Sequence, residues 1–328
     1  MLLFIDNQNI TDPARNLALE EYALKNFPIE NDYLLFYING PSIIIGRNQN
    51  TAEEINQEYV EQNGIQVVRR LSGGGAVYHD LGNLNFSFIT KDDGQSFHNY
   101  RKFTEPVVKA LHKLGVAAEL TGRNDIQVGE RKISGNAQFA TKGRMFTHGT
   151  LLFDSQMEHV ASALKVNPEK IKSKGVKSVR SRVANITEFL REPMTIEQFK
   201  QYLLESIFEG SDIHRYELSA SDWQQVDKLT NERYRNWDWN YGKSPAFNVQ
   251  HVKRLGTGTF DVRLYVEGGI IRTAAIYGDF FGQGDVREVE EKLIGVRYDR
   301  TALAAVSAQI DLPHYFGPIT SAEWLELL

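Results

Sequence analysis

The sequence predicts an α+β fold, with a large first domain over 1–241 and a small α+β domain over 246–328. Helical and strand periodicities alternate through the first part, which is typical of a sheet covered by helices. At 260–267, apolar and polar residues alternate strictly, as in a half-buried antiparallel strand. The 328 residues also exceed the roughly 250–300 at which a single core stops growing. We expect the aromatic and turn-rich segment 237–245 to connect the two domains.

The first elements follow from local signals. Residues 1–6 predict a strand, and Asp12 with Pro13 begins a helix as N-cap and first helical residue. A capping box at 51–54 begins a second helix, which Gly64 ends. Further strands are expected at 33–38, 42–45, 66–69, 76–79, 84–89, 132–140, 144–153 and 270–277, and further helices near 107–114, 158–164, 195–208, 221–234, 286–293, 302–308 and 322–327.

Composition excludes several function classes. A net charge of −5 argues against a protein that coats nucleic acid. No apolar run approaches the roughly 20 residues that span a bilayer, and no signal segment precedes the first strand, so we expect a cytoplasmic protein. The chain has no cysteine, which removes disulfides, thiolate metal sites and thiol nucleophiles. Its eight histidines form no HxH or HExxH pair, so we expect no zinc site.

A glycine-rich loop between two predicted strands is the first candidate site. Gly73, Gly74 and Gly75 let the backbone turn tightly and let a ligand lie against main-chain N–H groups. Arg70, just before the loop, offers a fork of donors that fits phosphate or carboxylate. The alternative is a flexible hairpin tip, which would not require a flanking arginine. The loop matches neither GxxxxGK[ST] nor GxGxxG, and it leads into a strand rather than a helix.

Lys132 is the candidate catalytic residue. It follows a tight turn at Gly129 and begins a predicted strand, from which it could neutralise charge that develops on an α-phosphate. Gly135 allows a ligand to approach this strand closely. The alternative is a solvated hairpin lysine. Asp125 could bind Mg²⁺ together with ATP phosphates, or it could simply begin a turn.

A basic run covers 170–182, with six positive charges and no acidic residue. Such runs are usually solvated surface loops. In a chain that also carries a glycine-rich loop and a candidate phosphate-binding lysine, we interpret it as a lid that closes over an anion.

Taken together, these segments resemble the lipoate–protein ligase family over nearly the whole chain. The pattern Arg-Arg-x-x-Gly-Gly-Gly-Ala-Val-x-His-Asp at 69–80 is similar to the signature of that family. The segment 132–135 resembles its catalytic lysine segment, 148–152 its next pocket strand, and 174–182 its adenylate-binding loop. The tail from Phe247 resembles its accessory domain.

The resemblance implies a mixed central β-sheet flanked by helices, related to biotin protein ligases, with a small α+β accessory domain. It implies that ATP, with Mg²⁺, activates free lipoate to lipoyl-AMP. The lipoyl group then passes to a lysine of an acceptor protein. The implied acceptors are lipoyl domains of 2-oxoacid dehydrogenase E2 subunits and the glycine-cleavage H protein. We expect a monomer with no nucleic-acid or membrane partner.

The resemblance also assigns roles to individual residues. Lys132 is implied to contact the lipoate carboxylate, the α-phosphate and the mixed anhydride. The implied ATP and adenylate residues are Arg70, Ser72, Gly75, Ala76, Val77, Tyr78, Lys132, Lys177 and Arg180. The implied lipoate residues are Gly74, His79, Lys132, Ala137, His148 and Gly149. The one candidate metal ligand is Asp125.

Three alternatives remain at this point. A lipoyl or octanoyl transferase of the same superfamily would use a cysteine acyl-enzyme, and this chain has no cysteine. A biotin ligase would carry a more arginine-rich loop than 72–75. A non-catalytic regulator that binds lipoyl-AMP would not require Lys132. Ser72, His79 and Asp80 suggest a hydrolase triad, but they lie too close together on one strand and its loop to converge.

Overall fold

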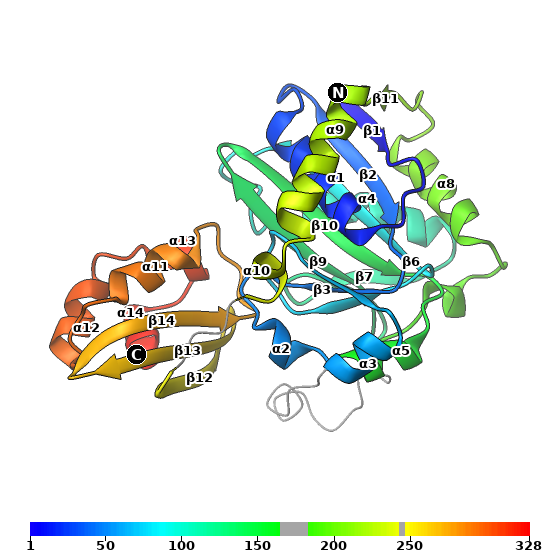
Figure 1. Cartoon of the computed structure of the whole chain (residues 1–328). Helices are drawn as coiled ribbons and strands as arrows, with labels where there is room; N and C mark the ends of the chain where they lie inside the picture. Colours follow the sequence, from blue (N-terminus) through cyan, green and yellow to red (C-terminus); the bar gives the residue numbers. More distant parts are fainter. Residues whose placement is uncertain (165–182, 243–246) are drawn as a thin grey trace. The chain divides into compact units, whose positions relative to one another are not determined.

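The computed structural model describes residues 1–164, 183–242 and 247–328 (Figure 1). Contacts divide the chain into two compact units. The first unit comprises 1–44, 55–68 and 77–236, and the second comprises 45–54, 69–76 and 237–328. The second unit therefore includes two short segments from the first part of the chain, one of which carries the glycine-rich loop.

An eight-stranded sheet organises the first unit, in the order β11-β1-β2-β6-β10-β9-β8-β7. Strand β1 pairs in parallel with β2 and β11, and the other pairs are antiparallel, so the sheet is mixed as expected. The strands are β1 (Leu2–Asp6), β2 (Asp32–Ile38), β6 (Asn83–Lys91), β7 (Ala118–Thr121), β8 (Asp125–Val128), β9 (Arg131–Thr141), β10 (Arg144–Leu152) and β11 (Arg215–Tyr216).

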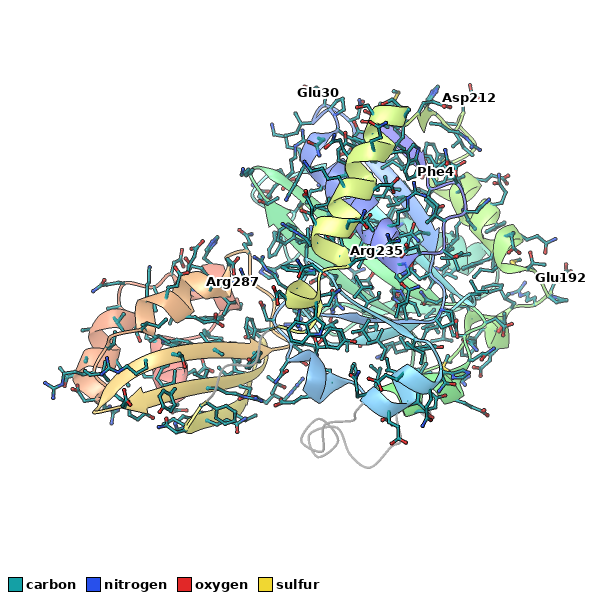
Figure 2. All side chains as sticks on the ribbon, viewed as in Figure 1. Phe4, Glu30, Glu192, Asp212, Arg235 and Arg287 are labelled. Atoms are coloured by element: carbon teal, nitrogen blue, oxygen red, sulfur yellow. The ribbon has the colours of Figure 1, made fainter. Side chains whose placement is uncertain are left out.

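Helices pack on this sheet. Helix α1 (Pro13–Asn26) contacts β6, β10 and α9 (Ala220–Leu229), and α9 continues into the π-helix η2 (Thr230–Tyr234). Helix α4 (Tyr100–Lys113) packs against α8 (Ile196–Ile207) over a core that also includes Phe4 (Figure 2). Glu30, Glu192 and Asp212 are exposed and extend away from the ribbon (Figure 2).

A second, three-stranded sheet has the order β4-β3-β5, with β3 (Ser42–Ile45), β4 (Gln66–Arg69) and β5 (Val77–His79). The glycine-rich loop connects β4 to β5. The remaining short elements of this part of the chain are α2 (Thr51–Glu54), α3 (Gln57–Gln62), α5 (Met157–Ala163) and the 3₁₀ helix η1 (Ile186–Phe189).

The C-terminal part of the second unit is a three-stranded antiparallel sheet with helices packed on it. Its core includes Phe260, Phe280, Phe316 and Trp324, whose rings pack in sequence at centroid distances of 4.5–5.3 Å. The elements are α10 (Trp237–Asn240), β12 (Val249–Leu255), β13 (Gly258–Glu267), β14 (Ile270–Gly278), α11 (Val286–Leu293), α12 (Arg300–Ser307), α13 (Leu312–Phe316) and α14 (Ser321–Leu325).

The helix expected from 51 to Gly64 is two helices instead of one. Ile55 is fully buried and forms an isolated β-bridge with Leu164, which interrupts the helix. Asn56 then caps α3, its side chain accepting from Tyr59 N–H. The four short or weakly patterned strands β7, β8, β11 and β12 were not expected from the sequence.

Candidate active site

Lys132 lies at a β-bulge. Strands β8 and β9 pair as Asp125↔Gly135 and Ile126↔Ser134, but the next pair is Gln127↔Lys132, so Ile133 is an extra residue in β9. In a regular strand, residues 132 and 135 would face opposite sides of the sheet. The bulge places the Lys132 side chain over Gly135, on the same side of the sheet as the Asp125 side chain.

An ion pair positions the ammonium group of Lys132, and backbone contacts fix its main chain. Its Nζ lies 2.8 Å from Asp125 Oδ1, with both side chains about one-quarter to one-third exposed. Its backbone carbonyl accepts from Ala184 N–H at 3.0 Å, and Lys132 also forms a β-bridge with Val183. A partly exposed lysine with a fixed backbone, whose ion pair among the described residues is the one with Asp125, can accept a bound anion without unfolding its surroundings.

His148 and Ala137 are direct cross-strand neighbours on β10 and β9. The His148 ring lies 4.7 Å from that of Phe146. Its Nδ1 is 3.0 Å from both carboxylate oxygens of Glu20 on α1, and Glu20 is 2% exposed. Because a carboxylate accepts, Nδ1 carries a proton and the ring orientation is fixed.

Gly149 faces the other side of the sheet. Its neighbour on β9 is Asn136, and a Cβ on Gly149 would lie 2.1 Å from Asn136 Oδ1 and 2.7 Å from the Phe86 ring. Packing within the first unit therefore explains why residue 149 is glycine. Its assignment to the lipoate site remains a prediction.

Tyr78 and His79 are buried residues of β5. The Tyr78 ring stacks on His159 at 6.1 Å, and burial raises the pKa of Tyr78 to about 12, with smaller contributions from Asp80 and Tyr59. His79 is 4% exposed, and its Nδ1 lies 3.0 Å from Asn39 Nδ2. Val77 and Ala76 are half-buried just before them.

In the second unit, Arg70 organises the glycine-rich loop. Its Nε donates to Ser72 Oγ at 3.0 Å, and its Nη2 donates to the carbonyl oxygens of Gly73 and Gly75 at 2.7 and 2.9 Å. Arg70 is 6% exposed. The guanidinium therefore fixes the shape of the loop to which the sequence assigned phosphate binding.

The three glycines of this loop have different reasons to be glycine. A Cβ on Gly73 would lie 2.4 Å from the carbonyl oxygen of Phe280. Gly74 has φ +90°, and its Cβ would lie 2.8 Å from the Phe281 ring. A Cβ on Gly75 would have no heavy atom of the described residues within 4 Å. At Gly75, neither packing nor a positive φ accounts for glycine, which leaves space for a ligand.

Arg69 has a structural role, and the sequence alone did not distinguish this role from that of Arg70. Arg69 is 2% exposed, and its side chain donates six hydrogen bonds to acceptors of residues that the structure describes, none of which is a carboxylate. Burial lowers its pKa to about 10. The acceptors are the carbonyl oxygens of Gly46, Arg47, Gln49, Trp239 and Asn240 and the hydroxyl of Thr51.

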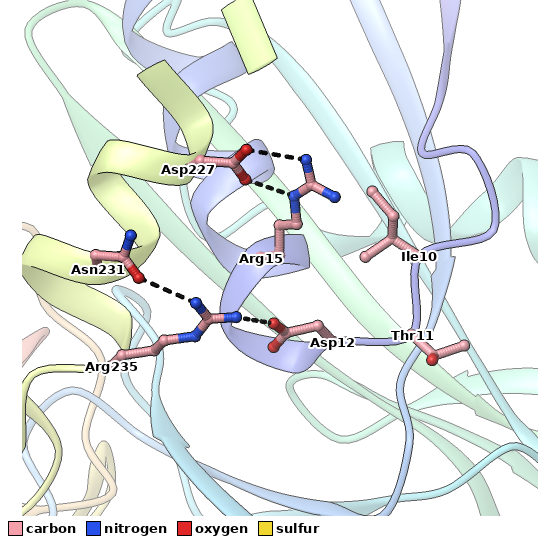
Figure 3. Close-up of a pocket in the computed structure, with 7 residues that line it drawn as sticks. All are labelled: Ile10, Thr11, Asp12, Arg15, Asp227, Asn231 and Arg235. Atoms are coloured by element: carbon pink, nitrogen blue, oxygen red, sulfur yellow. Dashed lines mark hydrogen bonds and ion pairs between the residues drawn. The ribbon is translucent and has the colours of Figure 1, made fainter. Parts of the chain in front are cut away.

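An open hollow of about 580 Å³ lies elsewhere on the first unit, beside α1 and α9 (Figure 3). Its two arginines are already paired. Arg15 binds Asp227 through two hydrogen bonds of 2.6 and 3.1 Å, and Arg235 binds Asp12 at 2.5 Å (Figure 3). These pairs join the helices to one another, so we do not assign this hollow to the substrate anion.

Lys177 and Arg180 lie outside the described residues, so their roles remain predictions. Within 1–164, 183–242 and 247–328, no group of three or more His, Asp or Glu side chains is placed to hold a metal ion. No helix in the same ranges is both long and apolar enough to cross a membrane.

The chain is similar to known families and proteins over nearly its whole length. The model of the lipoyl protein ligase A/B catalytic domain matches residues 12–208, and that of the bacterial lipoate protein ligase C-terminus matches 244–328. Lipoate-protein ligase LplJ of Bacillus subtilis is 62% identical over 330 residues, covering 100% of both chains. Lipoate–protein ligase 1 of Staphylococcus aureus is 56% identical, covering 99% of each.

Solved structures agree with these matches. Plasmodium falciparum LipL1 in complex with lipoate superposes with a TM-score of 0.80 at 24% identity, covering 99% of this chain and 97% of that one, which supports the fold. Lipoate-protein ligase A bound with ATP gives a TM-score of 0.63 at 31% identity, over 74% of this chain and 98% of that one. The mixed sheet, the two matching family models and the full-length relatives together show that this chain is an enzyme of the lipoate–protein ligase family.

Proposed function

We propose that this ligase joins lipoate to a protein lysine in two steps. In the first step, a lipoate carboxylate oxygen attacks the α-phosphorus of ATP, and pyrophosphate leaves. In the second step, the lysine amine of the acceptor attacks the carbonyl carbon of lipoyl-AMP. AMP then leaves, and the amine gives up a proton. The first step is needed because a free carboxylate has no adequate leaving group.

The placement of Lys132 carries this proposal. The first step brings two anions together, and a preorganised cation reduces their repulsion and stabilises the charge that develops. Lys132 presents an ammonium group at a bulge on the same side of the sheet as Asp125 and Gly135. Substrate oxygens would replace or share the contact that Asp125 now makes.

The lipoate residues follow from the resemblance and from the geometry of the first unit. We assign the lipoyl and carboxyl end to the wall formed by Ala137 and His148, whose ring Glu20 orients. We retain His79, Gly74 and Gly149 as further lipoate residues on the resemblance alone.

The nucleotide residues are proposed on the loop that Arg70 organises. The open space at Gly75 would admit phosphate oxygens to main-chain N–H groups. The resemblance supplies the rest of the set, which is Ser72, Ala76, Val77, Tyr78, Lys177 and Arg180.

Mg²⁺ fits this chemistry as a partner of the ATP phosphates. Such sites often need only one or two protein carboxylates, because phosphates and water supply the remaining ligands. Asp125 is a half-buried carboxylate beside Lys132, so we propose it as that ligand. Bound Mg²⁺ would neutralise phosphate charge during the first step.

The proposed acceptors are lipoyl domains and the glycine-cleavage H protein. A similar structure, the bi-partite lipoate protein ligase of Thermoplasma acidophilum, is described together with its E2 lipoyl domain. It is 33% identical, with a TM-score of 0.65 over 76% of this chain and 98% of that one. We further propose a cytoplasmic monomer.

The test is to incubate the purified chain with ATP, Mg²⁺, lipoate and a lipoyl domain, and to measure pyrophosphate release and the mass of the acceptor. Lys132→Ala should slow lipoyl-AMP formation by about 10²–10³-fold while the protein stays folded. Lys228→Ala is the matched control, because Lys228 is a 63% exposed surface lysine. Near-normal pyrophosphate release by folded Lys132→Ala would overturn the assignment.

A further inference from the structure

Three buried asparagines lead from the loop after β1 to His79. Asn7 Nδ2 donates to Asn16 Oδ1 at 3.0 Å, and Asn16 Nδ2 donates to Asn39 Oδ1 at 2.9 Å. Asn39 Nδ2 then lies 3.0 Å from His79 Nδ1. All four side chains are at most 4% exposed, so water does not compete with these contacts.

The Ile10 carbonyl determines how the side-chain amides of Asn7 and Asn16 are oriented in this hydrogen-bonded series. The Ile10 carbonyl oxygen can only accept, and it lies 3.0 Å from Asn7 Nδ2 and 2.9 Å from Asn16 Nδ2. The Ile38 carbonyl oxygen lies 3.4 Å from the same nitrogen of Asn16. Turning either amide over would set an amide oxygen against a carbonyl oxygen, which costs a buried hydrogen bond and adds repulsion.

The orientation of the Asn39 amide and the tautomer of His79 follow from these orientations of Asn7 and Asn16. Because Asn16 presents Nδ2 to Asn39, the facing atom of Asn39 must be its acceptor oxygen. The other end of the Asn39 amide is then the donor that faces His79. Nδ1 of His79 must accept this hydrogen bond, so Nδ1 carries no proton.

We infer that Asn39, oriented by Asn16 and Asn7, is a positioning residue that holds His79 as the neutral tautomer with its proton on Nε2. His79 can then act only as a donor through Nε2, which suits an acyl or carboxylate oxygen of the substrate. This arrangement is the reverse of that at His148, where Glu20 requires the proton on Nδ1. The consequence for catalysis rests on the proposed function, whereas the tautomer itself does not.

The test uses the imidazole ¹⁵N chemical shifts of the full-length, unliganded protein, which distinguish the two neutral tautomers and the imidazolium. His79→Asn identifies the His79 signals. In the wild type, His79 should show a protonated Nε2 and an unprotonated Nδ1. In Asn39→Asp, the new carboxylate can still accept from Asn16 but now requires a donor, so a proton should appear on Nδ1.

Two further variants keep the test decisive if Asn39→Asp does not fold. Asn39→Ala should leave His79 with averaged shifts from both tautomers, and it should raise the KM for lipoate by about tenfold with little change in kcat. Asn85→Ala removes another buried asparagine, one that donates to the Tyr37 carbonyl, and should leave the His79 signals unchanged.

A proton on Nδ1 in the wild type, or unchanged His79 signals in Asn39→Ala, would overturn the inference. If no lipoate-dependent activity is found at all, the proposed function fails, while the ¹⁵N result still decides the tautomer.

Discussion

A methyl group at residue 135 should disturb catalysis without unfolding the protein. A Cβ on Gly135 would lie 2.8 Å from Lys132 Nζ and 3.0 Å from Lys132 Cε, whereas ordinary contact begins at 3.4 Å. In Gly135→Ala, the ammonium group must therefore move by roughly 0.6–1.2 Å. The obstructing atoms are the far end of a flexible side chain, so the strand itself has no reason to shift.

We expect Gly135→Ala to lower mainly the rate of lipoyl-AMP formation. A displacement of about 1 Å in a positioned group can cost on the order of 10²-fold in rate. We therefore expect lipoyl-AMP formation to fall by about 100-fold. Alanine is favoured over glycine within a strand by roughly 0.5–1 kcal/mol, so the free energy of unfolding should change by no more than about 1 kcal/mol.

Lipoate-dependent pyrophosphate release measures the rate, and urea denaturation measures the stability. Gly256→Ala is the control, because a Cβ there has no heavy atom of the described residues within 4 Å and the backbone φ is not positive. Wild-type pyrophosphate release by Gly135→Ala would refute the proposed dependence on Lys132 placement. A large loss of stability would instead assign Gly135 to folding.

Three further predictions separate structural from ligand-binding residues. Gly73→Ala should lower the urea midpoint, because its Cβ would lie 2.4 Å from the Phe280 carbonyl oxygen, whereas Gly75→Ala should keep the midpoint and lose ATP affinity in a titration. Arg69→Met should lower the free energy of unfolding by about 3–5 kcal/mol in urea, since it removes six hydrogen bonds, four of them buried and two partly buried. A change below about 1 kcal/mol would contradict this. A chain ending at Tyr241 loses Phe280, and we expect it to transfer lipoate from supplied lipoyl-AMP but to activate free lipoate poorly; equal loss of both half-reactions in a folded protein would count against this.

Local signals predicted the elements that local physics determines. The alternation over 260–267 correctly predicted β13, and Asp12 with Pro13 correctly predicted the start of α1. The division of α2 from α3 was not predicted, because it depends on the bridge between Ile55 and Leu164, more than a hundred residues apart. Strands β7 and β8, with the sequences AELT and DIQV, contain no apolar run such as the three consecutive isoleucines that mark β3.

In the candidate site, too, the features that the sequence did not predict depend on contacts between residues distant in sequence. Lys132 could be identified from its motif, but the bulge that turns it toward Gly135 depends on pairing with β8 and leaves no local trace. Glu20 was missed, because its burial on α1 and its contact with His148 depend on the packing of α1 and leave no local trace in the sequence. The separate roles of Arg69 and Arg70 depend on what each contacts, which two adjacent identical residues cannot reveal.

The division into units has a consequence for biosynthesis. The chain passes between the units at 44–45, 54–55, 68–69, 76–77 and 236–237. Gly73 is synthesised roughly 200 residues before Phe280, on which it packs, a delay of about 10–40 s at ordinary elongation rates. During that interval the large sheet can form, but the loop around Arg70 has no surface to close on. A ribosome-bound chain would therefore form its lysine-bearing sheet first, and its glycine-rich loop could pack only after Phe280 has emerged.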